Sequence, residues 1–172
     1  MPITIVRPPA VYGQRDSDIF LFFKAISKGV FTQLGFNSKS LSLVHVKDLI
    51  HGMYLAATND RSSGETYFLG SEQPEYEWPA IAKISGKILG KKRRRVRVPH
   101  STLLMIGRIN RLFKGFRSKP ATLSYEKAKE IIQPSWSCRS DKAMTELGYK
   151  EQRSIEEGIR ETILWYKEEG WL

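Results

Sequence analysis

The first part of the chain alternates short apolar runs with stretches of helical periodicity. Residues Pro2–Arg7 form a nearly continuous β-branched run, which predicts a strand covered on both faces, as in a parallel sheet. The Pro8-Pro9 pair ends this run, because proline donates no backbone hydrogen bond. Residues Ser40–Val46 and Gly64–Gly70 predict two further strands. The pattern predicts an α/β arrangement for this part of the chain.

Helices are predicted between these strands. Residues 16–18 (Asp-Ser-Asp) can cap a helix over 19–29 that stops at Gly29. Residues 47–58 form an amphipathic pattern. Its expected buried face holds Leu49, Met53 and either Ala56 or Ala57. Residues 75–90 are also helix-like.

The second part of the chain is predicted to be mostly helical. Residues 93–99 alternate arginine and valine weakly, as in an exposed edge strand. Helices are expected over 100–116 and 122–132, then after a Ser140-Asp141 cap. A capping box, Ser154 with Glu157, opens a last helix that runs to the C-terminus. The apolar stripe of the 100–116 helix comprises Leu103, Ile106, Ile109, Leu112 and Phe113.

Charge is concentrated in one segment. The 172 residues carry 28 Lys and Arg against 18 Asp and Glu, a net charge of +10. Residues 91–119 hold eleven basic side chains and no acidic one, so the remainder is nearly neutral. This distribution indicates a local basic face or partner rather than a chain that binds polyanions generally.

Length and composition indicate one domain with a real core. Cys138 is the only cysteine, which excludes an internal disulfide, fits a cytoplasmic location, and is expected to be inert packing. No apolar run approaches the roughly 20 residues of a membrane span, and no signal peptide is visible. His51 and His100 have no acidic or cysteine spacing that suggests a ligand set, so no metal site is expected.

Three stretches, in order, carry a resemblance to a known family. Residues 3–16 (ITIVRPPAVYGQRD) resemble the late strand and RPxxVYG turn of extended short-chain dehydrogenases/reductases. Residues 41–57 (LSLVHVKDLIHGMYLAA) resemble the HVxDL strand and helix that follow. Residues 136–172 resemble the closing segment, with its LGY turn and long last helix. The chain thus resembles the C-terminal portion of an NAD-dependent epimerase/dehydratase, with the hydroxysteroid-dehydrogenase-like branch nearest.

The resemblance implies the fold and the function of a parent enzyme. The fold class would be α/β: the C-terminal part of a Rossmann-like sheet over about 1–70, and a mostly helical substrate-binding cap over about 71–172. The parent would use NAD or NADP to oxidise or reduce a nucleotide sugar, a sterol-like alcohol or a related lipid. The substrate, the choice of cofactor, and epimerase against dehydrogenase or dehydratase stay open.

Two family hallmarks are absent from the sequence. No GxxGxxG turn follows a first strand, and the catalytic Tyr-x-x-x-Lys would precede the Pro2–Arg7 strand. Tyr125 and Lys129 match that spacing literally, but they follow the strand and are interpreted as coincidence. Tyr12 has Asp16 where the lysine would stand. We therefore expect no catalytic residue, no bound dinucleotide and no activity in this chain alone, with Met1 as a truncation point or an artificial start.

The resemblance assigns the turn after the first strand to the cofactor. Pro8, Pro9, Ala10 and Val11 match residues that line the nicotinamide end, where prolines would shape a wall. The alternative is that two prolines simply end a strand and fix a turn.

The same resemblance assigns three residues to the substrate: Tyr12, Arg15 and His45. Arg15 suits a phosphate or another polar group, but an exposed loop arginine is an equal alternative. His45 on a strand is alternatively a hydrogen-bonded structural residue. Asp48 is expected to cap the following helix or to hold a loop.

The basic segment 91–119 has three interpretations. The first is a solvated strand and helix. The second is contact with anionic membrane or a lipid substrate, because a row of arginines precedes a helix with apolar residues. Under this interpretation the chain has an alternative function, as a non-enzymatic module that binds anionic membrane or polyanions. The third is nucleic acid, ranked last because aromatic residues are poorly interleaved. The apolar residues of the second interpretation are Leu103, Met105, Ile106, Ile109, Phe113 and Phe116. A free edge on the Pro2–Arg7 strand also predicts self-association.

Overall fold

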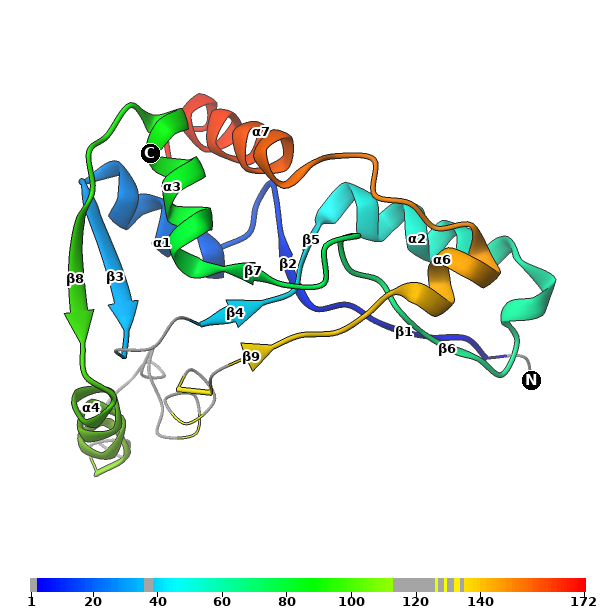
Figure 1. Cartoon of the computed structure of the whole chain (residues 1–172), viewed down its shortest axis with the longest axis horizontal. Coiled ribbons are helices and arrows are strands. Elements are labelled where there is room, and N and C mark those ends of the chain that lie inside the picture. Colours follow the sequence, from blue (N-terminus) through cyan, green and yellow to red (C-terminus); the bar gives the residue numbers. More distant parts are fainter. Residues whose placement is uncertain (1–2, 36–38, 113–125, 127–128, 130–131, 134) are drawn as a thin grey trace.

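The computed structural model describes residues 3–35, 39–112, 126, 129, 132–133 and 135–172. Within them, small sheets follow one another along the long axis of the molecule; most of the helices lie on one side of them, and one helix lies at the lower left, beyond the end of a strand (Figure 1). No helix in these ranges is long and apolar enough to cross a membrane.

One end of the molecule is built on the first strand of the chain. β1 (Ile5–Arg7) pairs in parallel with β6 (Thr66–Phe68), which follows a 3₁₀ turn at Asp60–Ser62. Helices α2 (Val46–Thr58) and α6 (Asp141–Leu147) lie on one side of this pair (Figure 1). The core between them comprises Ala56, Tyr67, Leu69, Ala143, Leu147 and Tyr149.

The centre of the molecule contains two further sheets. β2 (Ala10–Tyr12) pairs in parallel with β5 (Leu43–His45). β4 (Ser40–Leu41) lies between β7 (Tyr76–Glu77), antiparallel, and β9 (Ser135–Trp136), parallel. Three helices pack around the largest core: α1 (Asp18–Ser27), α3 (Trp78–Leu89) and α7 (Ile155–Glu168). That core includes Tyr12, Phe23, Leu41, Leu43, Tyr76, Ile81, Ile159, Ile163 and Tyr166.

The opposite end of the molecule carries the arginine-rich strand. β3 (Val30–Leu34) pairs in parallel with β8 (Arg94–Val98), and α4 (His100–Leu112) continues from β8 (Figure 1). Phe31 is buried against Ile26 of α1 and Ala82 of α3, so these two helices cover one face of the pair.

Several sequence predictions are confirmed. Strands form within 2–7 and 64–70, and β8 lies within the predicted edge strand, with all of Arg94–Arg97 exposed. The capping box is present, because the Glu157 N–H donates to Ser154 Oγ (3.3 Å) and the Ser154 N–H donates to Glu157 Oε2 (2.8 Å). Asp16 accepts the Asp18 and Ile19 N–H groups and so caps α1 as expected.

Two predicted elements are divided in the structure. The predicted strand 40–46 is two strands, β4 and β5, because the Ser42 N–H donates to the Trp136 carbonyl and the chain changes sheet there. The predicted turn 8–11 is a turn only at its prolines, since Ala10 and Val11 already pair with β5. The prolines therefore end β1, but the chain forms another strand, β2, directly after them.

Other boundaries differ for similar reasons. β3 was not predicted, and its partner β8 lies far along the chain. The helix expected from residue 75 begins at Trp78, because Tyr76 and Glu77 pair with β4. The last helix ends at Glu168 rather than at the C-terminus, and Trp171 folds back to stack on Tyr166.

Burial corrects three expectations. β1 is covered on one face only, because no element of the described chain lies over Ile5. Met53 is exposed and Gly52 faces the core instead, where a Cβ would lie 2.7 Å from Leu69 Cδ1. Ser140 does not cap α6, because its hydroxyl accepts the Gly70 N–H.

Some expectations lie outside the described residues. These include most of the predicted helix 122–132, with Tyr125, and the residues Phe113 and Phe116.

Candidate functional site

The Pro8-Pro9 turn lies at the carboxyl ends of two parallel strands. It follows β1 directly, and the Leu69 N–H after β6 donates to the Arg7 carbonyl (3.3 Å). A Cβ on Gly70 would lie 3.4 Å from Pro9 Cγ, in ordinary van der Waals contact, so the segment after β6 lies beside the turn. In open α/β sheets, ligands bind outside the carboxyl ends of the strands. The turn predicted to line a cofactor is therefore at the ligand-binding edge of its sheet.

Ser140 holds the segment after β6 that lies beside this turn. Its Oγ accepts the buried Gly70 N–H at 2.7 Å and would lie 3.3 Å from a Cβ at Gly70. Pro8 is exposed, while Pro9, Ala10 and Val11 are half-buried. The four predicted cofactor residues thus form a continuous, partly open stretch.

Tyr12 and His45 are brought together by strand pairing. They are opposite each other in the β2–β5 register, and their rings meet edge to face with centroids 5.2 Å apart. Each is only 2% exposed, so neither presents appreciable surface to a ligand. A Cβ on Gly158 of α7 would lie 2.2 Å from the Tyr12 hydroxyl, so this glycine gives the phenol its space.

Burial controls the ionisation of this pair. It raises the pKa of Tyr12 far above its ordinary value, and the charges of Glu151 and Asp48 act in the same direction. Burial also lowers the pKa of His45, more than the nearby carboxylates raise it. Both side chains are neutral at neutral pH.

His45 also begins helix α2. Its Nδ1 accepts the Lys47 N–H (3.4 Å), while its Nε2 is buried with no hydrogen-bond partner among the described residues. Gly13 lies close to this nitrogen, because a Cβ there would be 3.4 Å from Nε2 and 2.5 Å from Val46 Cγ1. The positive φ of Gly13 (146°) is a second reason for glycine at this position. The structural interpretation of His45 is therefore supported by its contacts.

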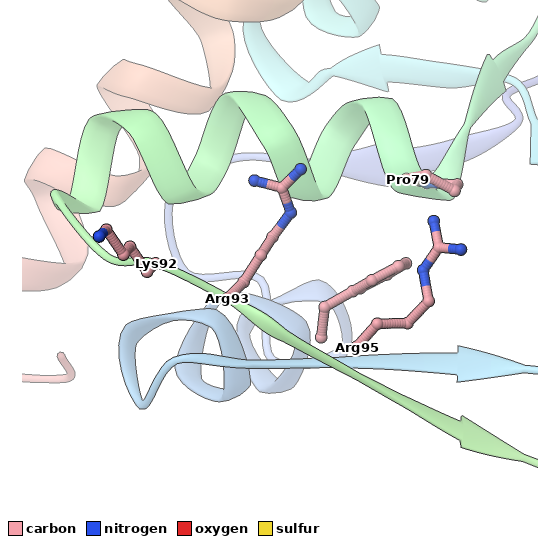
Figure 2. Close-up of a pocket in the computed structure, with 5 residues that line it drawn as sticks. Pro79, Lys92, Arg93 and Arg95 are labelled. Atoms are coloured by element: carbon pink, nitrogen blue, oxygen red, sulfur yellow. The ribbon is translucent and has the colours of Figure 1, made fainter.

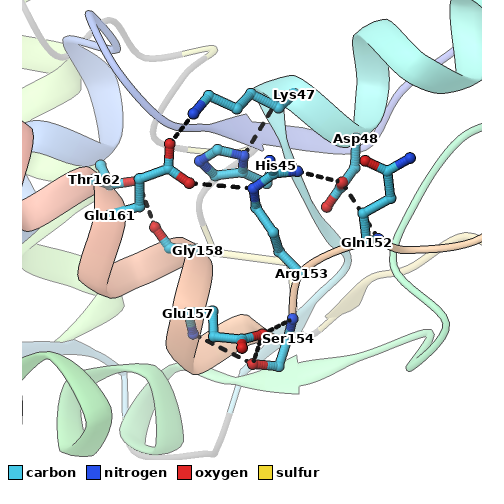
Figure 3. A network of polar contacts seen from close by, with 10 residues as sticks. All are labelled: His45, Lys47, Asp48, Gln152, Arg153, Ser154, Glu157, Gly158, Glu161 and Thr162. Carbon is cyan, nitrogen blue, oxygen red and sulfur yellow. Dashed lines mark hydrogen bonds and ion pairs between the residues drawn. The ribbon is translucent and has the colours of Figure 1, made fainter.

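A polar network joins the start of α2 to the start of α7 (Figure 3). Arg153 donates from Nη1 to the buried Asp48 Oδ1 (3.0 Å) and from Nε to Glu161 Oε2 (3.1 Å). Lys47 forms an ion pair with the other oxygen of Glu161, and this contact is the main reason that the pKa of Glu161 is lowered. Asp48 also accepts the Gln152 N–H, so it holds a loop rather than capping its helix.

Tyr166 fixes the loop that carries Arg15. Its hydroxyl donates toward the carbonyl oxygens of Gly13 (3.2 Å) and Asp16 (2.7 Å). Between these anchors, Arg15 is exposed and has a positive φ of 67°, which is uncommon for a non-glycine residue. The loop therefore presents Arg15 at the surface while Tyr12 stays inside.

The sequence did not identify four of the residues that build this region: Arg153, Gly158, Glu161 and Tyr166. Each contacts a residue far away in the chain. Their only signal in the sequence was membership of the closing segment that carries the family resemblance. Of the three expected substrate residues, Tyr12 and His45 lie together inside, and Arg15 lies on the adjoining loop.

Two characterised relatives align with nearly the whole chain. Ceramide reductase of Caulobacter vibrioides is 24% identical over 168 residues, covering 98% of this chain and 52% of that protein. The decarboxylating sterol-4-alpha-carboxylate 3-dehydrogenase of Candida albicans is 25% identical over 177 residues, covering 95% and 49%. The chain spans about half the length of these relatives. No family model matches the sequence.

Solved structures show the same fold. An epimerase from Methanothermobacter thermautotrophicus superposes with a TM-score of 0.72 at 20% identity, over 99% of this chain and 45% of that one. UDP-glucose 4-epimerase from Thermotoga maritima gives 0.69 at 18% identity, over 96% and 46%. These neighbours confirm the predicted Rossmann-type α/β fold class. The chain therefore matches the C-terminal portion of NAD-dependent epimerase/dehydratase proteins, as the sequence predicted.

Proposed function

We propose that this chain forms the substrate-binding C-terminal portion of an NAD(P)-dependent oxidoreductase or epimerase. The observation that carries the proposal is the Pro8-Pro9 turn at the carboxyl ends of β1 and β6, in a chain that aligns almost entirely with half of such enzymes. A dehydrogenase, a reductase and several epimerases among the similar proteins favour a small-molecule alcohol or ketone as the parent's substrate.

The turn fits the nicotinamide end of a dinucleotide. Proline rings at 8 and 9 give a rigid apolar wall, and their lack of N–H groups favours carbonyl acceptors for a carboxamide. Gly70, held by its hydrogen bond to Ser140, lies beside Pro9 and adds no side chain there. A bound nicotinamide would carry the hydride. This chain's own contribution is to shape and desolvate one side of that site.

On the substrate side, Arg15 is the proposed contact residue. Its exposed position and anchored loop suit a polar or anionic substrate group. Tyr12 and His45 are proposed as positioning residues, because their burial lets them fix the loop and the strand pair but not touch a ligand directly.

The uncovered side of β1 and β6 supports a second, cofactor-binding portion in the parent enzyme. Ile5 is 47% exposed and Phe68 41% exposed, on the face away from α2 and α6. Parallel sheets are normally covered on both faces. We propose that a cofactor-binding βα portion of the parent covers this face and supplies the phosphate-binding turn and the Tyr-x-x-x-Lys pair.

Calorimetry with NAD and NADP tests the proposal at its first step. We expect no micromolar dinucleotide binding and no turnover by this chain alone. Co-expression with the half of the Caulobacter ceramide reductase that it does not match should restore NADH binding, detected by nicotinamide fluorescence. A Pro8→Gly, Pro9→Gly variant should weaken that binding. Tight one-to-one NAD binding by the isolated chain would overturn the proposal.

A further inference from the structure

The residues just before and within β8 form a dense cationic surface. Six of the seven residues from 91 to 97 are basic, and all seven are exposed. We call these six the basic face: Lys91, Lys92, Arg93, Arg94, Arg95 and Arg97. Across the described chain, none of them is ion-paired with a carboxylate. This surface therefore has full positive charge available for an external anion.

One side of the basic face is hollowed. Figure 2 shows Arg93 and Arg95 extending between β8 and α3, beside Lys92 and Pro79. With Phe31 these residues line a hollow of about 400 Å³. The Arg95 guanidinium lies 6.0 Å from the centre of the Phe31 ring, which orients it without neutralising its charge. The hollow is large enough for a phosphate-bearing head group and offers it several cationic donors.

The strand geometry brings more charge to the same surface. Successive side chains of a strand point to opposite faces, so Arg94 and Val96 lie on the side away from α3. Within the described residues β8 pairs only with β3, so its other edge is open. All of these side chains are exposed, and those of both faces border the open edge of β8. An anionic surface could therefore approach them along that edge.

Apolar side chains are exposed beside these cations. Val96 is 41% exposed, and Met105 and Ile106 of the adjoining helix α4 are 55% and 40% exposed. Apolar side chains interspersed with Lys and Arg are typical of segments that lie in a membrane interface.

We propose that the basic face, together with Val96, Met105 and Ile106, is a docking surface for an anionic phospholipid bilayer. The cations bind head-group phosphates and carboxylates, the hollow receives a head group, and the three apolar side chains enter the interface. Duplex nucleic acid would use the cations alone, through its phosphates, and would leave the three exposed apolar side chains without a partner. The proposal is independent of the oxidoreductase function.

Vesicle co-sedimentation of the full chain tests it. We expect binding to phosphatidylcholine vesicles that contain phosphatidylserine, no binding to phosphatidylcholine alone, and weaker binding as salt rises. The triple variant Arg93→Gln, Arg94→Gln, Arg95→Gln should bind about 100-fold more weakly, from the contribution of each basic residue at an anionic surface. Equal binding to both vesicle types would overturn the proposal.

A charge-matched variant controls for net charge. Arg61→Gln, Lys150→Gln, Lys167→Gln removes the same charge from exposed sites on other elements. It should bind phosphatidylserine vesicles within about twofold of wild type, because only charges near the surface contribute within a Debye length. Similar losses in both triple variants would show general attraction to a cationic protein and would contradict a docking surface.

The apolar residues separate a bilayer from nucleic acid. Met105→Gln, Ile106→Gln should weaken vesicle binding about tenfold by removing apolar burial, and should leave binding to a duplex DNA unchanged. Thermal unfolding should match wild type, because both side chains are exposed. Unchanged vesicle binding in this variant, or tighter binding of wild type to duplex DNA than to vesicles at equal phosphate concentration, would overturn the proposal.

Discussion

The two ends of the molecule have the same backbone arrangement but expose different kinds of side chain. β1–β6 and β3–β8 are both two-stranded parallel sheets with helices on one face. At the β1–β6 end the uncovered face displays Ile5 and Phe68, with the exposed Arg7 opposite Phe68. At the β3–β8 end the uncovered face displays Arg94 and Val96, and arginines extend over the covered side as well. Strand pairing alone does not determine what an end can bind.

The difference indicates two kinds of partner. Exposed apolar area costs about 25 cal/mol per Å², which burial against protein removes. Exposed arginines are well solvated and need no cover, but they attract anions over a distance of several ångströms. We therefore expect the β1–β6 end to associate with protein and the β3–β8 end to associate with an anionic surface. The four predictions below test this contrast and the connection between the two ends.

The largest effect is expected where the two ends are joined. α2 covers β1–β6, α7 packs in the central core against α3, which covers β3–β8, and the Asp48–Arg153 ion pair links α2 to the start of α7. Asp48→Ala should lower the free energy of unfolding by about 3 kcal/mol, because it removes the buried acceptor of both Arg153 and the Gln152 N–H, while Arg153 keeps its pair with Glu161. Urea unfolding followed by circular dichroism measures this. Glu72→Ala, at an exposed carboxylate in the loop after β6, is the control and should change stability by less than about 0.5 kcal/mol.

A smaller effect is expected at the turn beside β6. Ser140→Ala removes the acceptor of the buried Gly70 N–H and should cost about 1–3 kcal/mol. Ser85→Ala is the matched control at the other end, since the buried Ser85 hydroxyl only donates to a carbonyl of its own helix, that of Ile81. Thermal or urea unfolding compares the two. Equal losses would mean that the Ser140 contact has no special role.

The contrast between the two uncovered faces predicts different association. We expect the chain to self-associate through β1–β6, and Ile5→Lys, Phe68→Lys to weaken this association by roughly tenfold or more through lost apolar burial. The double variant Thr32→Lys, Val96→Lys adds the same charge to the β3–β8 face and should leave the self-association unchanged. Sedimentation velocity over a concentration series distinguishes these outcomes. A strictly monomeric wild-type chain at high concentration would refute association through this face.

Local signals in the sequence predicted the elements that depend on local chemistry. The Ser154–Glu157 capping box, the glycine-bounded strand β6 and the Asp16 cap of α1 all act within a few residues. β3 was missed because Val30–Leu34 becomes a strand only by pairing with β8. The division of 40–46 was missed for the same reason, since Ser42 changes partner through a contact with Trp136.

The candidate site shows the same limit. The Pro8–Val11 stretch was identified by resemblance, and its position at a sheet edge agrees with that assignment. The contacts that fix the residues after it are long-range: Arg153 is 105 residues from Asp48, and Tyr166 is 153 residues from Gly13. Burial of His45 and Tyr12 follows from packing by α7, which no local pattern contains.

The smallest effect is a pH dependence that originates at His45, between the two ends. Burial lowers the pKa of this imidazole in the folded state below its unfolded value of about 6.5, so the unfolded chain binds the proton more readily. Stability contributed by neutral His45 is therefore complete above pH 6.5 and falls as the pH decreases below it. The slope cannot exceed about 1.4 kcal/mol per pH unit for one proton.

The groups that face His45 allow this contribution to be isolated. Glu161 and Asp48 favour the charged imidazole, while Arg153 and Lys47 oppose it, and burial outweighs them all. Glu151 has a raised pKa, again mainly through burial, so its own contribution has the opposite pH dependence. The difference in unfolding free energy between wild type and His45→Gln, measured from pH 7.5 to about 5, cancels Glu151 to first order. That difference should shrink steadily below about pH 6.5; a constant difference would mean that His45 titrates alike in both states.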